Sequence, residues 1–134
     1  MPYAIKFIEN NRIIQIKNNG ELSYEELLTQ TREVIKIQQE KSTSLILTEF
    51  VSVKLDVNIA DIFQFPEVYE QLGMQRKSKI AVVVSDVEIK TDELQFYETI
   101  CLNRGWNIKI FLKEKEAIKW LLSESIIQMG NLIE

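Results

Sequence analysis

The chain has 134 residues, with 16 lysines and arginines against 20 aspartates and glutamates, so its formal net charge is −4. Apolar residues make up 46% and charged residues 27%, which is typical of one soluble globular domain with its own core. Because histidine is absent and Cys101 is the single cysteine, the sequence excludes histidine-based catalysis, an internal disulfide and a thiolate metal cluster within one chain.

The first predicted element is a β-hairpin. Residues 3–8 alternate with the period of a strand, Asn10-Asn11 is a turn signal, and residues 13–17 resume an extended pattern rich in isoleucine. The segment Asn18–Gly20 is expected to close this unit.

An amphipathic helix is predicted over residues 23–40. Ser23 precedes Glu26 by three residues, which is the spacing of a capping box, and apolar residues then follow at helical intervals.

Two uninterrupted apolar runs predict strands that are buried on both faces of a sheet. The first run is Leu45–Leu47, within residues 44–50, and the second is Ile80–Val84, within residues 79–85. Residues 51–57 are ambiguous between a continuation of the first strand and a loop. Both runs are expected to lie side by side at the centre of the sheet.

A helix with an aromatic inner stripe is predicted between these two strands. Asp56 or Asn58 is expected to cap it, and Gly73 is expected to end it. Pro66 lacks a backbone N–H and lies in its middle, so two short helical pieces are predicted. The inner stripe consists of Ile62, Phe65, Tyr69 and Leu72.

The remaining elements are a helix from Thr91 to Gly105, a strand over residues 106–112 and a helix over residues 115–123. The order ββαβαβαβα predicts a single α/β domain over residues 1–123. Its mixed sheet has the first strand antiparallel at an edge and the later strands parallel. Residues 124–134 are a tail without a predicted structure.

Three segments carry a family resemblance. They are the hairpin ending in Gly20 with the helix start Ser23–Glu26, the strand Lys79–Val83, and the strand Ile110–Leu112 followed by Glu116–Leu121. Together they resemble the SpoIIAA-like proteins, which are related to STAS domains and share a fold with the lipid-binding CRAL-TRIO domains. The resemblance spans about residues 3–122 and implies a SpoIIAA-like fold.

The resemblance also has a departure. STAS anti-anti-sigma factors carry a phosphorylatable serine in an Asp-Ser-Ser-Gly-like element, at the start of the helix that follows the third strand. Here the stretch reads Asp56-Val57-Asn58-Ile59, without a hydroxyl or a glycine, and Ser52 is a poor match. The resemblance therefore implies a non-enzymatic regulatory or protein-interaction module that lacks an evident phosphoacceptor. Its contacts are expected at Asp56, Asn58 and the loops after Glu49 and Asp86.

A second hypothesis is a carrier or sensor of a small apolar ligand or lipid. Phe63, Phe65, Tyr69 and Met74 are a rich apolar group for one short segment, and Pro66 is expected to loosen the helix that carries them. Such a flap over the sheet would open onto an apolar cavity, although plain core packing explains the same residues.

A third hypothesis, ranked last, is a metal-assisted enzyme. Glu49, Asp86 and Glu88 follow predicted strands, and ligands of open α/β sheets bind at the carboxyl ends of strands. Paired carboxylates hold Mg²⁺ or act as acid and base, but solvated loop charges and helix caps are the simpler explanation of the same residues. Cys101 lies on the inward row of its helix and is expected to be buried and inert.

The expected surroundings follow from composition. Mild acidity argues against a nucleic-acid partner, and scattered glycines leave no phosphate-binding loop, so no cofactor is expected. The N-terminus does not resemble a signal peptide and no run is long enough for a transmembrane segment, which favours a cytoplasmic protein. The apolar residues of the tail 124–134 need cover, either as a short helix added to the core or through self-association as a homodimer.

Overall fold

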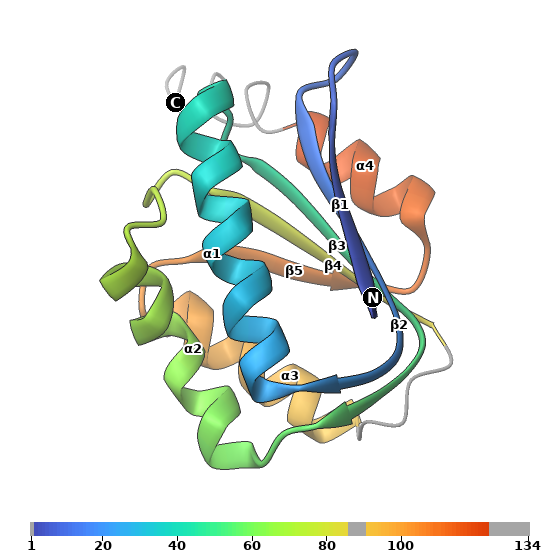
Figure 1. The fold of residues 1–134 in the computed structure, drawn as a ribbon, viewed down its shortest axis with the longest axis vertical. Coiled ribbons are helices and arrows are strands. Elements are labelled where there is room, and N and C mark those ends of the chain that lie inside the picture. Colours follow the sequence, from blue (N-terminus) through green and yellow to red (C-terminus); the bar gives the residue numbers. More distant parts are fainter. Residues whose placement is uncertain (1, 86–90, 124–134) are drawn as a thin grey trace, which may run out of the picture.

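The chain folds into a five-stranded sheet covered by helices on both faces (Figure 1), in a computed structural model that describes residues 2–85 and 91–123. The strand order is β1-β2-β3-β4-β5, with β1 antiparallel to β2 and every other neighbouring pair parallel. This confirms the predicted mixed sheet and element order. The elements are β1 (Tyr3–Ile8), β2 (Ile13–Ser23), α1 (Tyr24–Lys41), β3 (Leu45–Asp56), α2 (Ile59–Leu72), β4 (Lys79–Ser85), α3 (Thr91–Asn103), β5 (Asn107–Phe111) and α4 (Glu114–Leu122).

The hairpin forms where the sequence predicts it, but its second strand is longer than expected. β2 continues beyond Lys17 to Ser23, so the prediction that Asn18–Gly20 ends this unit is wrong. The pairing of β2 with β3 shifts register between Asn18 and Gly20, and Gly20 takes the left-handed φ of 73°. A bulge there lets the ladder resume, because glycine adopts this backbone conformation without steric cost.

Helix α1 starts as predicted. The Glu26 backbone N–H donates to Ser23 Oγ at 3.2 Å, and the Ser23 backbone N–H donates to Glu26 Oε1 at 3.0 Å. This reciprocal capping box satisfies two N–H groups that the helix itself leaves unpaired.

Strand β3 resolves the ambiguity over residues 51–57. It runs to Asp56 because the extended part of β2 pairs alongside it, from Gly20 opposite Val53 to Ser23 opposite Asp56. Its pairing with β4 stops at Val51, so the last part of β3 is held by β2 alone.

Helix α2 is continuous, and the predicted break at Pro66 is wrong. Asn58 rather than Asp56 caps it, with Asn58 Oδ1 accepting from the Asp61 backbone N–H at 2.9 Å, and Gly73 ends it with a left-handed φ of 90°. Packing overrides the loss of one backbone hydrogen bond, because Pro66 is buried and its carbonyl accepts from Trp106 Nε1 at 3.1 Å.

Two cores lie on opposite faces of the sheet. The larger lies under α1, α2 and α3, and the smaller lies under α4, where Ala117 and Leu121 pack on Leu47 and Ala81. Every residue of β4 from Lys79 to Val84 is buried, which confirms the predicted central strand. The larger face has three helices to pack and carries the candidate site.

We expect Ser23→Ala to lower the free energy of unfolding by about 1 kcal/mol, because the Glu26 N–H loses its partner. Urea denaturation measures this change. Thr29→Ala is the matched control, since the Thr29 hydroxyl bonds only the Glu25 carbonyl within α1. The control should leave stability unchanged or slightly raised; equal losses in both variants would contradict the capping role.

Candidate functional site

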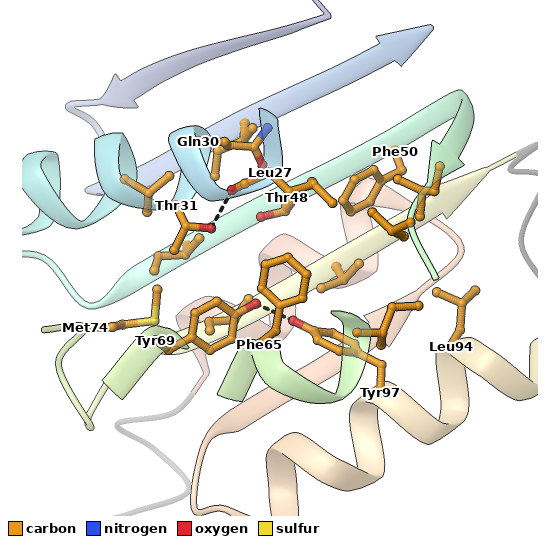
Figure 2. A pocket seen from close by; sticks show the side chains of 18 of the residues that line it. Leu27, Gln30, Thr31, Thr48, Phe50, Phe65, Tyr69, Met74, Leu94 and Tyr97 are labelled. Atoms are coloured by element: carbon orange, nitrogen blue, oxygen red, sulfur yellow. Dashed lines mark hydrogen bonds between the residues drawn. The ribbon is translucent and has the colours of Figure 1, made fainter. Parts of the chain in front are cut away.

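A cavity of about 120 Å³ lies between the sheet and helices α1, α2 and α3 (Figure 2). Its floor is the face of the three middle strands that points away from α4. The floor residues are Ile16, Ile46, Thr48, Ile80 and Val82. Four of these five are β-branched aliphatic residues, whose stiff side chains hold a defined surface.

Helix α1 supplies one wall and, within the described lining, the one side-chain amide, Gln30. Gln30 Nε2 donates to Asn18 Oδ1 at 2.6 Å, and Asn18 Nδ2 donates to the Glu49 carbonyl at 3.0 Å. These two hydrogen bonds, called the Gln30–Asn18 relay below, connect α1 to β2 and β3 and fix the orientation of the Gln30 amide. The neighbouring Thr31 hydroxyl donates to the Leu27 carbonyl at 2.8 Å, so it is satisfied within the helix.

Aromatic side chains from α2 and α3 form the opposite wall. The hydroxyls of Tyr69 and Tyr97 are 2.5 Å apart and share a hydrogen bond, and the Tyr69 ring meets the Trp106 ring edge-on with centroids 5.7 Å apart. Burial raises the pKa of both tyrosines well above the ordinary value, so each hydroxyl remains neutral at physiological pH. Figure 2 shows this pair across the cavity from Gln30 and Thr48.

The electrostatic character of the cavity is set by what its described lining contains. Among those residues there is no lysine or arginine, and Glu93 is the single charged side chain. The remaining lining is largely aliphatic and aromatic, with neutral polar groups from Gln30, Thr31, Thr48 and the two tyrosines.

The structure separates the three aromatic residues that the sequence grouped together. Phe65 and Tyr69 are buried and line the cavity, together with Met74. Phe63 instead faces outward with 37% of its surface exposed. The centroid of its ring lies 4.6 Å from the ring centroid of Phe96 on α3. The helical spacing explains this, since residues 65 and 69 share a face of α2 that residue 63 does not.

The two polar residues at the start of α2 lie outside the cavity. Asp56 ends β3 and is exposed, and Asn58 caps α2 from an exposed position. Val57, which lies between them, is the residue of this segment that reaches the cavity.

Glu49 lies on the other face of the sheet, beneath the α4 side. The prediction that it follows the end of a strand is wrong, because β3 continues seven residues further to Asp56. Gln15 Nε2 donates to Glu49 Oε2 at 2.7 Å, and Glu114, at the start of α4, is the neighbouring carboxylate that acts on Glu49. Burial, more than the neighbouring Glu114, raises the pKa of Glu49 to about 7, against smaller opposing effects of Gln15 and Lys17.

The carboxylate group proposed for a metal-assisted enzyme is not assembled by the described part of the chain. Asp86 and Glu88 lie outside the described residues. Within residues 2–85 and 91–123, no three acidic, cysteine or histidine side chains gather in a metal-binding cluster.

Cys101 is buried next to the tyrosine pair, as the sequence predicts. Burial raises the pKa of its thiol to about 12, although a hydrogen bond with Tyr97 opposes the shift. The thiol therefore stays protonated and is a poor nucleophile.

Sequence reasoning missed Asn18, Gln30 and Thr48. A signal for two of them was present: Gln30 lies three residues after Leu27 and four before Val34, on the apolar face of α1, and Thr48 continues a strand that is otherwise aliphatic. A polar residue at a core position calls for a partner or a ligand. Asn18 gave no such signal, because it resembled a turn residue.

Comparison with known proteins places this architecture in a class. No family model matches the chain, and no curated protein matches it. The crystal structure of an uncharacterised protein of the DUF3478 family from Shewanella loihica PV-4, described as having a SpoIIAA-like fold, is similar with a TM-score of 0.54. The two chains are 16% identical, and the alignment covers 89% of this chain and 91% of that one.

The protein is therefore an α/β protein with a SpoIIAA-like fold, as the resemblance in its sequence implies. At this level of identity the likeness defines the fold alone, and fold does not assign function. None of the helices in residues 2–85 and 91–123 has the length and apolar character needed to cross a membrane.

We expect the free energy of unfolding to fall as the pH rises from about 4.5 to about 7, by on the order of 1–3 kcal/mol. In this range the folded protein holds a proton on Glu49 that the unfolded chain has lost, so raising the pH favours unfolding. Glu49→Gln mimics the protonated carboxyl and should flatten this slope, with the largest gain in stability near pH 8.

Urea denaturation between pH 5 and pH 8 measures this slope. The control is Glu116→Gln, which changes an exposed carboxylate in the first turn of α4 and should leave the pH profile parallel to that of the wild type. Parallel profiles for Glu49→Gln and the wild type would contradict the assignment.

Proposed function

We propose that this protein binds a small apolar molecule in the cavity between the sheet and helices α1, α2 and α3, as a non-enzymatic carrier or sensor. The observation that carries the proposal is the cavity itself, about 120 Å³ in size and lined almost entirely by apolar side chains. An engineered protein cavity of about 150 Å³ with a similar lining binds benzene. The expected occupant is therefore about the size of one aromatic ring.

Energetics support a binding role over incidental loose packing. The cavity is partly open to the surface, so an apolar molecule that enters it replaces water against apolar side chains, which is favourable. Protein interiors are normally packed with few voids larger than a water molecule. A bound apolar molecule fills this space and contacts the apolar side chains that line it.

We expect toluene to bind the purified protein with a Kd of about 0.1–1 mM, from the contact energy available to a ligand of seven non-hydrogen atoms. Titration followed by NMR should shift signals of the cavity residues. Leu27→Trp replaces a cavity-lining leucine on α1 with a much larger side chain, which should occupy the cavity and abolish binding.

Leu28→Trp is the matched control for this experiment. Leu28 is the next residue of α1, is also partly buried, and does not line the cavity. The control should bind toluene like the wild type. Absence of toluene binding to the wild type, or retention of binding by Leu27→Trp, would contradict the proposed function.

The exposed Phe63–Phe96 pair supports a second candidate function, the protein-interaction module that the SpoIIAA-like resemblance implies. The two rings expose 37% and 48% of their surfaces, and aromatic residues supply much of the binding energy of interfaces. With a second copy as partner, Phe63→Ser should lower the dimer fraction in sedimentation equilibrium. Leu102→Ser, at a comparably exposed position further along α3, should not. A wild type that is monomeric at all concentrations would contradict self-association.

A further inference from the structure

The floor of the cavity carries a hydroxyl that the protein itself does not use. Thr48 lies in the middle of β3 with Ile16 beside it on β2 and Val82 beside it on β4, and both neighbours are buried. Among the described residues, no group forms a hydrogen bond with the Thr48 side chain. Thr48 is partly exposed and lines the cavity, so its hydroxyl is available to a molecule bound there.

A second polar atom, Gln30 Oε1, also lacks a partner among the described residues. Gln30 is 5% exposed, and its Nε2 atom is committed to Asn18. Because Asn18 is in turn bonded to the Glu49 carbonyl, the amide cannot rotate to satisfy its oxygen without breaking the relay. Gln30 and Thr48 both line the cavity, and both are drawn across it from Tyr69 and Tyr97 (Figure 2).

The other neutral polar groups of the described lining each take part in a hydrogen bond. Thr31 donates to the Leu27 carbonyl, and the hydroxyls of Tyr69 and Tyr97 bond each other. Among these neutral groups, Gln30 Oε1 and the Thr48 hydroxyl are therefore the ones without a partner among the described residues.

Charge then restricts the kind of polar group that fits. The described lining has no cation to pair with a carboxylate or phosphate, and Glu93 would repel either. Burying an ionised group without a partner costs several kcal/mol, which exceeds what a single hydrogen bond returns.

From these observations we infer that the cavity selects a neutral apolar molecule carrying one hydroxyl, and that this hydroxyl donates to Gln30 Oε1 and bonds the Thr48 hydroxyl. Organic anions of the same size are rejected. This inference rests on the proposed function, since it names the class of ligand for the same cavity.

Toluene, benzyl alcohol and benzoate test the inference as a matched series, because they share one ring and differ in a single substituent. Their affinities for the wild-type protein are measured by NMR titration at pH 7. Benzyl alcohol and toluene should both bind, and benzoate should bind at least tenfold more weakly than benzyl alcohol.

The Thr48→Val variant isolates the hydroxyl, because it keeps the β-branched shape that the strand accommodates. It should weaken benzyl alcohol about three- to tenfold while toluene keeps or gains affinity, which is the range expected for one hydrogen bond. Thr29→Val is the matched control, since the Thr29 hydroxyl bonds the Glu25 carbonyl within α1 and does not line the cavity, and it should leave both affinities unchanged.

The outcomes separate this inference from the function on which it rests. Failure of toluene to bind the wild type overturns both. If toluene binds but benzoate matches benzyl alcohol, or if Thr48→Val changes the two neutral ligands equally, the hydroxyl selectivity is wrong and the apolar binding function stands.

Discussion

The parallel pairing of β3 between β2 and β4 is the constraint on which the rest of the structure depends. Alternate side chains of a strand point to opposite faces, so this register sends Ile46 and Thr48 toward the cavity and Leu47 and Glu49 toward α4. A slip by one residue would exchange Thr48 with Glu49 and place a carboxylate in the apolar cavity. The character of both faces therefore follows from one register.

The two faces meet different packing problems, and the cavity lies on the face that three helices cover. On the α4 side a single short helix packs through Ala117 and Leu121 on a cluster that includes Leu47 and Ala81. On the other side three helices must share one sheet face. Helix α2 is held by the Trp106 bond to the Pro66 carbonyl, and α1 is held by the Gln30–Asn18 relay. These hydrogen bonds fix where α1 and α2 lie, and the side chains between them and the sheet leave the cavity unfilled.

Much of the fold could be predicted from the sequence, and the candidate site only in part. The strand and helix order, the capping box at Ser23 and the burial of Ile80–Val84 are visible as local periodicity. The continuity of α2 through Pro66 was predicted wrongly, because burial of Pro66 and the bond from Trp106, just before β5, outweigh one missing backbone hydrogen bond. Glu49 was misplaced because β3 continues past a bulge between Phe50 and Val53, where its pairing with β2 shifts register, and local pattern does not reveal this continuation.

The sequence by itself determined the SpoIIAA-like class of fold, since alternation, helical spacing and apolar runs are properties of neighbouring residues. The tertiary structure alone decided that an apolar space remains beneath α1, α2 and α3, and which polar atoms face it. Whether a side chain finds a partner depends on residues far away in the chain: Gln30 meets Asn18 twelve positions earlier, while Tyr69 meets Tyr97 across two helices. Such pairings arise from packing geometry, which no local pattern encodes.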